Sequence, residues 1–381
     1  MTRTNGSVRL TRAAGAVLVA LLVSATLAAC SGGGNEKAAA EPKRTTTTTT
    51  TVPPSTTTTK PPLPRAPLTG LEDPSGQSVM RPAVSVKVEN TPGSRPQGGL
   101  DQADVVYEEV VEGNITRLVA MFNSQVPDVI GPVRSVRAID PDIVWPLGGI
   151  FAFSGGAPIN VEAAQAAPVT LITENNQDVL IRNAPGQPPR DAPHNLYALG
   201  PQLFGAGGQP VPSPTLFEYY VPSAGVANAP GVISMRVGFA AGYDPTWVWD
   251  AGSWSWKRFM DGAPHTAVSG GQIAPQNVVV QFTEYPGEGD GITVGEGDVW
   301  VFTDGQVRAG RWMRPDRAQP ARYVDGSGTP ILLRPGTTWV ELLPTGSPVD
   351  VEFAPPPTTT TAPPTTVPPT TTAKKGKKTG S

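Results

Sequence analysis

Valines recur at every second position of the segment PAVSVKVE (82–89), which is the period of a half-buried β-strand. Similar runs follow at 104–111, 116–122 and 149–153, and then at 277–282, 298–302, 306–312, 331–333 and 338–343. Only 140–144 and 161–167 have the character of helices. A stretch rich in Gly, Pro and Ser (205–232) separates the two groups of strands and is expected to connect them.

These patterns predict an α+β protein. A mixed α/β N-terminal domain (67–210) is expected to precede a mostly antiparallel β C-terminal domain (225–354). The second domain is expected to form a sandwich or a small barrel, because short strands follow one another with little helix between them.

Four tryptophans alternate around a turn in TWVWDAGSWSWKRF (246–259), and this pattern predicts a β-hairpin. Two interpretations of the tryptophans are open. They could pack in a core or pair across strands, which is the commoner use of alternating aromatic residues, or they could form a stacking surface for sugar rings.

The first thirty residues have the pattern of a lipoprotein signal. Three arginines precede an apolar stretch (13–29) that ends in the run Leu-Ala-Ala-Cys at 27–30. The pattern predicts a signal peptide (1–29) and a lipid on the thiol of Cys30, which would hold an exported protein on the outer face of the cytoplasmic membrane. The alternative is a plain secretory signal with an incidental cysteine. A permanent span is not expected from so short an apolar run.

Thr/Pro-rich segments flank the body at 30–66 and 355–381. Such segments have too little apolar surface to offset the entropy of ordering, so both are predicted to be disordered. They could be O-mannosylation sites or unmodified spacers. The second ends in four lysines, which could contact anionic lipid or an anionic envelope polymer.

Residue counts narrow the chemistry. One cysteine and two histidines exclude an internal disulfide and a three-histidine metal centre, and we predict no metal and no cofactor. The segments on either side of the body, residues 1–66 and 355–381, hold 12 of the 29 basic residues but only 2 of the 32 acidic residues. The body (67–354) therefore carries a net charge of −13, which argues against nucleic acid as a partner.

Polar side chains concentrate in two segments of the first half. In GPVRSVRAID (131–140), Arg134 and Arg137 flank Ser135, and on a helical turn both guanidinium groups would share one face and could grip an anion. Alternatively, each arginine could bond backbone carbonyls. In RDAPHNLY (190–197), His194 stands in a turn where it could be structural, bind an anion or act as a general base.

Carboxylates of the protein itself could pair with Arg134 and Arg137. Glu108 and Glu109 are expected to face opposite sides of their strand, so at most one of them should share a pocket with the arginines. Glu108, Glu112 or Asp191 could then neutralise the pair and make it a structural clamp rather than a ligand site.

A serine hydrolase is a second hypothesis. The run AFSGG (152–156) is a degenerate nucleophile elbow in which alanine replaces the first glycine. Ser154 would be the nucleophile, with Asp178 or Asp191 and then His194 following in the order found in serine hydrolases.

Several long motifs carry a family resemblance: RPAVSVKVENTPGSRPQGGLDQADVVYEEVVEGNITRLVAMF, IGPVRSVR and APHNLY, followed by NVVVQF, DGQVRAGRW and PGTTWVELLP. Over residues 68–350 the chain resembles the YerB-like lipoprotein family, whose two parts are domains of unknown function. The resemblance implies a lipoprotein outside the membrane and no established reaction. The motif residues that carry over are Lys87, Asn90, Arg95, Asp104, Glu108, Glu112, Arg117, Arg134, Ser135, Arg137, His194 and Asn195.

The preferred hypothesis is a lipid-anchored envelope protein that binds an anionic ligand or acts as a scaffold. A phosphate, a uronic acid, a peptide carboxylate or an envelope protein would be the partner. The candidate binding residues are Lys87, Asn90, Glu108, Arg134, Ser135, Arg137, His194 and Asn195.

Overall fold

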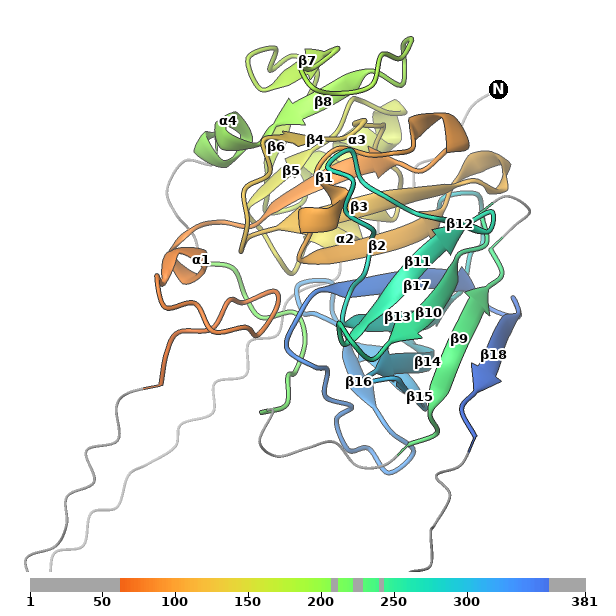
Figure 1. Ribbon diagram of the computed structural model, residues 1–381. Coiled ribbons are helices and arrows are strands. Elements are labelled where there is room, and N and C mark those ends of the chain that lie inside the picture. Colours follow the sequence, from red (N-terminus) through yellow and green to blue (C-terminus); the bar gives the residue numbers. More distant parts are fainter. Residues whose placement is uncertain (1–61, 207–211, 222–228, 240–242, 356–381) are drawn as a thin grey trace, which may run out of the picture. The chain divides into compact units, whose positions relative to one another are not determined.

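A ten-stranded mixed sheet contains strands from both halves of the sequence (Figure 1). The computed structural model describes residues 62–206, 212–221, 229–239 and 243–355. The strands of this sheet are β1 (Val84–Glu89), β2 (Val105–Val110), β3 (Thr116–Phe122), β5 (Ile150–Ala152), β6 (Thr170–Ile172), β13 (Asn277–Thr283), β14 (Gly295–Thr303), β15 (Gln306–Arg314), β16 (Arg322–Val324) and β17 (Thr338–Pro344). Their order is β16-β15-β14-β13-β17-β2-β3-β1-β5-β6.

Strand β17 joins the two halves, because it lies between β13 and β2 and pairs in parallel with both. The parts predicted as separate domains therefore share one sheet, and their boundaries stay a prediction. The described part of the expected connection packs on this body. Leu216 and Phe217 are buried, and Tyr219 Oη donates to the Leu68 carbonyl at 2.5 Å. Ala66, at the end of the expected tether, is also buried.

Two smaller sheets flank the large one. The first has the order β12-β11-β10-β9-β18 and is antiparallel, and the second has the order β4-β8-β7. Their strands are β9 (Val232–Val237), β10 (Thr246–Asp250), β11 (Ser255–Met260), β12 (Ala263–Pro264) and β18 (Val349–Phe353), and then β4 (Val129–Ile130), β7 (Leu180–Arg182) and β8 (Leu196–Leu199).

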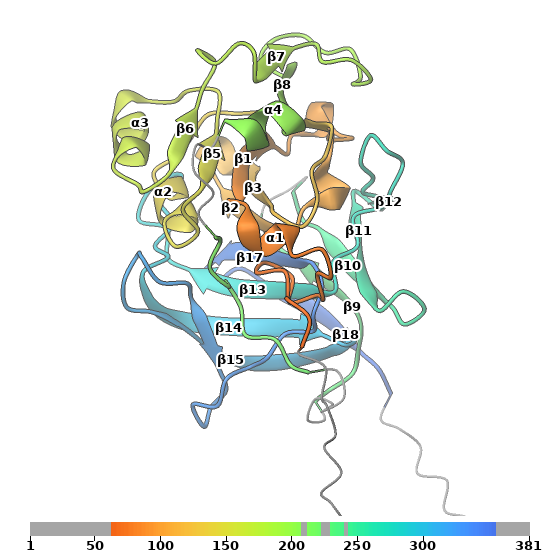
Figure 2. The same ribbon diagram turned by 90° about the vertical axis from the view of Figure 1, so that its left-hand side faces the viewer.

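Strands predominate in the described residues and the α-helices there are short, so the structure is mostly β and supports the predicted α+β class with a mixed N-terminal domain only in part. The α-helices are α1 (Gln77–Met80), α2 (Asp140–Val144), α3 (Pro158–Gln165) and α4 (Gly200–Gly205). Figure 2 shows α2 and α3 on the opposite side of the large sheet from β9, β10 and β11. The strand predicted at 331–333 is wrong, since Leu333 forms only an isolated bridge with Tyr219.

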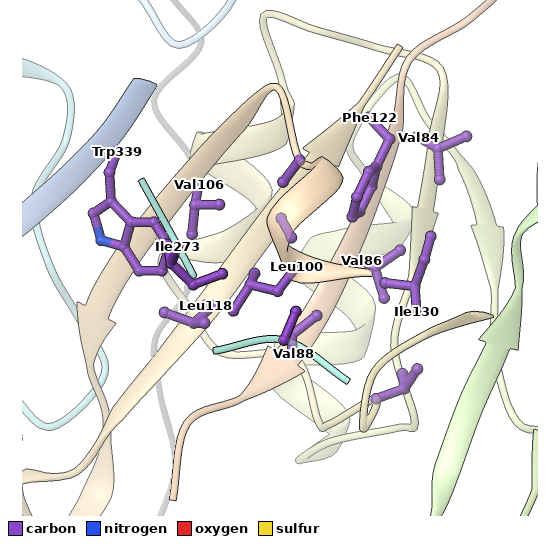
Figure 3. Packing of buried hydrophobic residues seen from close by; sticks show 14 of the residues in the cluster. Val84, Val86, Val88, Leu100, Val106, Leu118, Phe122, Ile130, Ile273 and Trp339 are labelled. Atoms are coloured by element: carbon purple, nitrogen blue, oxygen red, sulfur yellow. The ribbon is translucent and has the colours of Figure 1, made fainter. Parts of the chain in front are cut away.

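The large sheet separates two hydrophobic cores. Val84, Val86 and Val88 of β1 face the first core, together with Leu118 and Phe122 of β3 (Figure 3). The intervening residues of these strands face the second core, which α2 and α3 cover. Because both faces are covered, β1 is buried at every position rather than half-buried, and its polar side chains must find partners inside the protein.

The tryptophan hairpin forms as predicted, with Trp249 opposite Trp256 across β10 and β11. Trp247 and Trp256 are fully buried, so these two belong to the core. Trp254 is 48% exposed, and the Arg334 guanidinium lies 4.5 Å from the centroid of its indole ring. The hairpin therefore contributes mainly to packing.

Charged side chains are buried where the two halves meet. Glu108 of β2 lies opposite Glu341 of β17. Arg258 Nη2 donates to Glu108 Oε2 at 2.6 Å, and Trp247 Nε1 donates to Glu341 Oε1 at 2.9 Å. Burial and the neighbouring Glu108 raise the pKa of Glu341 well above its usual range. Glu341 is therefore protonated, and Arg258 balances the single charge of Glu108.

A neutral histidine completes this network. Arg258 Nη1 lies 2.7 Å from His265 Nδ1, and His265 Nε2 lies 2.9 Å from Gln97 Oε1. Burial and Arg258 hold the pKa of His265 well below its usual range. The ring therefore accepts at Nδ1 and donates at Nε2, which gives His265 a structural role.

Replacing Arg258 with methionine should lower the free energy of unfolding by about 3 to 5 kcal/mol, because Glu108 would keep a buried charge without its positively charged partner. Urea unfolding measures this loss, with the exposed Arg311→Met as a control that should leave the midpoint nearly unchanged. Adding Glu108→Gln to Arg258→Met should recover part of the stability. A double variant no more stable than the single one would show that the pair is not coupled.

Candidate functional site

The segment Pro132–Val136 is inserted between the carboxyl ends of the parallel strands β1 and β5. On one side, Arg134 N donates to the Lys87 carbonyl at 2.8 Å. On the other side, Ser154 N donates to the Arg134 carbonyl at 2.9 Å, and Val136 N donates to the Gly155 carbonyl at 2.8 Å. These bonds use the backbone groups that a helix would need. The helical turn predicted for Arg134 and Arg137 is therefore wrong, and α2 begins only at Asp140.

Arg134 and Arg137 each have partners within the protein for part of their guanidinium groups. Arg137 Nε donates to Glu112 at 2.7 Å, and its Nη1 donates to the Val136 carbonyl at 2.9 Å. Arg134 Nε lies 3.7 Å from Glu89 Oε2, beyond hydrogen-bond distance, and its Nη1 donates to the Pro193 carbonyl at 3.3 Å. The internal clamp considered above thus exists in part, with Glu112 and Glu89 as its carboxylates.

Arg117 of β3 is the least compensated of the nearby guanidinium groups. It is only 5% exposed, and its Nη1 donates to the Ser135 carbonyl at 3.0 Å. No carboxylate of the described residues forms a salt bridge with it. Burial, together with the charges of Arg137 and Arg134, lowers the pKa of Arg117 to about 10. A negative ligand would relieve this repulsion.

We call Arg117, Arg134 and Arg137 the arginine cluster. His194 borders it through Glu89, whose carboxylate oxygens lie 2.8 Å from His194 Nδ1. Because Glu89 accepts this hydrogen bond, Nδ1 carries the hydrogen, and Nε2 is the remaining ring nitrogen. The His194 side chain is 39% exposed. Arg134, Glu89 and His194 thus form a connected group at the end of β1.

The residues of the hydrolase hypothesis are not assembled. Ser154 Oγ lies 3.4 Å from Ser135 Oγ, and no hydrogen bond joins it to His194 within the described part of the chain. Asp191 bonds His194 only through its backbone carbonyl, which accepts from the His194 amide at 2.8 Å. The orienting carboxylate of His194 is Glu89 instead.

Several predicted binding residues lie elsewhere. Glu108 faces the opposite side of the sheet, where Asn90 Nδ2 donates to its Oε1 at 2.9 Å. Asn195 bonds Arg182 at 2.8 Å, toward β7. Lys87 lies beneath the cluster but is fully buried. Side chains alternate between the two faces of a strand, which explains why Glu108 lies away from the cluster. Glu109 rather than Glu108 lies on the face of Arg117.

Sequence reasoning missed Glu89, considered Glu109 only as the alternative to Glu108, and named Arg117 only through the family resemblance. A usable signal was present in β1, because Lys87 and Glu89 alternate with valines and so had to share one face. The strand register that sets Arg117 opposite Glu89 and Glu109 cannot be predicted from neighbouring residues in the sequence.

Beneath the cluster, Lys87 is enclosed by two buried carboxyl groups. Its Nζ contacts Glu109 Oε1 and lies 2.7 Å from Asp140 Oδ1. Burial and the charge of Asp140 raise the pKa of Glu109 to about 8. Lys87 and Asp140 therefore form the charged pair, and Glu109 holds a proton at neutral pH.

Comparison with known proteins identifies the class. This mostly β chain of two consecutive parts matches the family described as "Protein of unknown function (DUF3048)", with its N-terminal domain at residues 68–208 and its C-terminal domain at 235–340. The chain belongs to this family, which confirms the resemblance of its motifs.

One relative is YerB of Bacillus subtilis (strain 168), whose name provisionally calls it a lipoprotein. The two proteins are 29% identical over 297 residues, which cover 74% of this chain and 86% of YerB. The crystal structure of the YerB protein from Bacillus subtilis is similar, with a TM-score of 0.65 and 25% identity over 75% of this chain and 99% of that one.

The predicted signal peptide, Cys30, most of the tether and the C-terminal tail after residue 355 lie outside the described residues. Among the residues that are described, no helix is long and apolar enough to cross a membrane.

Replacing Glu109 with glutamine should weaken the pH dependence of stability. Folded Glu109 keeps its proton between its ordinary pKa of 4.5 and about 8, whereas the unfolded chain loses it. The wild-type free energy of unfolding should therefore fall as pH rises through this window, by up to about 1.4 kcal/mol per pH unit from this group. Urea unfolding across the window should show a shallower fall for Glu109→Gln.

Glu112→Gln is the matched control, because the pKa of Glu112 is lowered, chiefly by its hydrogen bond with Arg137, against an opposing effect of burial. It should leave the slope unchanged in the same window. Equal slopes for Glu109→Gln and the wild type would contradict the buried proton on Glu109.

Proposed function

We propose that this protein is an exported lipoprotein, held on the outer face of the cytoplasmic membrane by a lipid on Cys30, and that it binds an anionic envelope component at the arginine cluster. The lipid anchor is supported by the signal pattern that ends at Cys30. The name of the relative YerB points the same way.

The observation that carries the binding proposal is Arg117. A buried guanidinium group next to two further guanidinium groups is unfavourable unless negative charge answers it. Glu89 and Glu112 contact the other two arginines, which leaves one positive charge of the cluster without a carboxylate contact in the described structure. An anionic ligand is the partner that this arrangement favours.

Local geometry, rather than overall charge, must account for such binding. The body has a net charge of −13, so diffuse attraction of anions is not expected. Arg134, Ser135, Arg137 and His194 are all partly exposed, so this part of the protein is open to solvent.

Cys30→Ser tests the anchor. Without the thiol no lipid can be attached, so the protein should leave the membrane fraction or remain an unprocessed precursor. Cell fractionation and the size of the product measure this, with the neighbouring Ser31→Ala as a control that should remain membrane-bound. A processed Cys30→Ser protein that stays in the membrane fraction would overturn the lipoprotein assignment.

Arg117→Gln tests the site. Phosphate, sulfate and glucuronate should be compared at constant ionic strength, and at least one should raise the melting temperature of the wild-type protein. A ligand at 100 times its Kd stabilises by about 2.7 kcal/mol. Arg117→Gln should abolish this effect while leaving the ligand-free protein equally or more stable, because it removes a repelled charge.

Arg236→Gln is the matched control, since this exposed arginine pairs with Asp244 and Asp350 on another sheet. It should retain the response to anions. A strongly destabilised Arg117→Gln protein, together with a wild-type protein that no anion stabilises, would assign the cluster to a purely structural clamp.

A further inference from the structure

We propose that the group bound at the arginine cluster is a dianionic phosphoryl group, carried either as free phosphate or as a phosphate monoester. This inference rests on the proposed function and names the chemical class of its ligand.

The number of donors exceeds what a carboxylate needs. A carboxylate presents two coplanar oxygens and is satisfied by one guanidinium fork. The cluster brings together guanidinium groups from three positions: Arg117 on β3 and Arg137 both donate from Nη1 to the Ser135 carbonyl, at 3.0 and 3.3 Å, and Arg134 precedes that serine. A terminal phosphoryl group has three oxygens and up to two negative charges, which suits three neighbouring guanidinium groups better.

The turn between β5 and α3 adds backbone donors next to the arginines. This turn reads Ser-Gly-Gly-Ala before Pro158, and Gly155 has a φ of 138°, which favours glycine. No hydrogen bond of the described structure uses the amides of Gly156 and Ala157. Ala157 precedes an eight-residue helix and makes no side-chain cap, so the helix start remains open to an anion.

Hydrogen bonds tie this turn to the cluster. Ser154 N and the Gly155 carbonyl bond the backbone of Arg134 and Val136, respectively. A Cβ atom at Gly156 would lie 2.8 Å from Val136 Cγ1, so the two segments are in close contact. The turn therefore supplements the buried charge of Arg117 and would not make a site without it.

The position agrees with a general rule for parallel strands. β1, β5 and β6 run parallel, and α3 connects β5 to β6. Ligands of such units bind outside the carboxyl ends of the strands. Glu89 ends β1 and Ser154 follows β5 at that edge, where the arginine segment is inserted.

Isothermal titration at about pH 8 provides the test, because phosphate and its monoesters are then mainly dianionic. The probes are inorganic phosphate, glycerol 1-phosphate, dimethyl phosphate and glucuronate at equal ionic strength. Inorganic phosphate or glycerol 1-phosphate should bind the wild-type protein at least about tenfold more tightly than dimethyl phosphate and glucuronate. Arg117→Gln should abolish binding of every probe.

Ala157→Pro isolates the backbone donor. The φ of −58° and ψ of 142° at Ala157 suit proline, so this change removes one amide hydrogen at little conformational cost. It should weaken phosphate binding several-fold without changing the weak binding of glucuronate. Ala157→Ser keeps the amide and should bind phosphate like the wild type.

The outcomes separate this inference from the proposed function. Tight binding of both inorganic phosphate and glycerol 1-phosphate supports a phosphoryl ligand in either form, and preference for one of them identifies its source. If glucuronate binds as tightly as phosphate and both are lost in Arg117→Gln, the phosphoryl class is wrong while anion binding stands. If no probe binds, both proposals fail. The comparison of probes on the wild-type protein does not depend on how any variant folds.

Discussion

The parallel pairing of β2 with β17 is the constraint on which the rest of this structure depends. It places a strand from the end of the sequence beside one from its beginning and makes one sheet of both halves. Both faces of the central strands are then covered, so polar residues on them are buried as well. Arg258 forms the ion pair with Glu108, and burial together with Glu108 raises the pKa of the neighbouring Glu341, which favours its protonated form.

The same covering of both faces produces the arginine cluster. Lys87, Glu89 and Glu109 lie on the face that α2 and α3 cover, and Arg117 of the neighbouring β3 lies among them. Lys87 uses Glu109 and Asp140 as partners. Arg117 is left at the edge, next to arginines supplied by an inserted segment. A structural network and a candidate binding site are thus consecutive parts of one polar layer within the protein.

The candidate site also shows how a clamp and a ligand site can coincide. Glu112 holds Arg137 by a hydrogen bond, and Arg134 lies between the Pro193 carbonyl and the more distant Glu89, so both guanidinium groups have partners within the protein itself. Such internal partners reduce the conformational cost of binding, because few side chains remain to be ordered. In the proposed function, the charge that would attract a ligand comes from Arg117, which is held by a backbone carbonyl rather than by a carboxylate.

Local patterns in the sequence were sufficient for many elements. The alternating run of β3 and the short helix α2 match their predicted limits at 116–122 and 140–144, and the tryptophan hairpin forms where the turn residues indicated. Side-chain period, turn composition and helix starts are properties of neighbouring residues, so they can be read without a structure. The strands β6, β7 and β9 were not predicted, because the hydrophobic runs of the first two are brief and that of β9 is irregular.

By itself, then, the sequence determined the predominance of strands, the family of the chain and the presence of paired arginines near a histidine. Only the tertiary structure decided that β17 enters between β13 and β2, that Glu109 rather than Glu108 lies on the face of Arg117, and that Arg134 is in an extended segment. The physical reason is that strand register and the burial of both sheet faces arise from contacts between distant residues, and a shift of one residue would exchange the two faces.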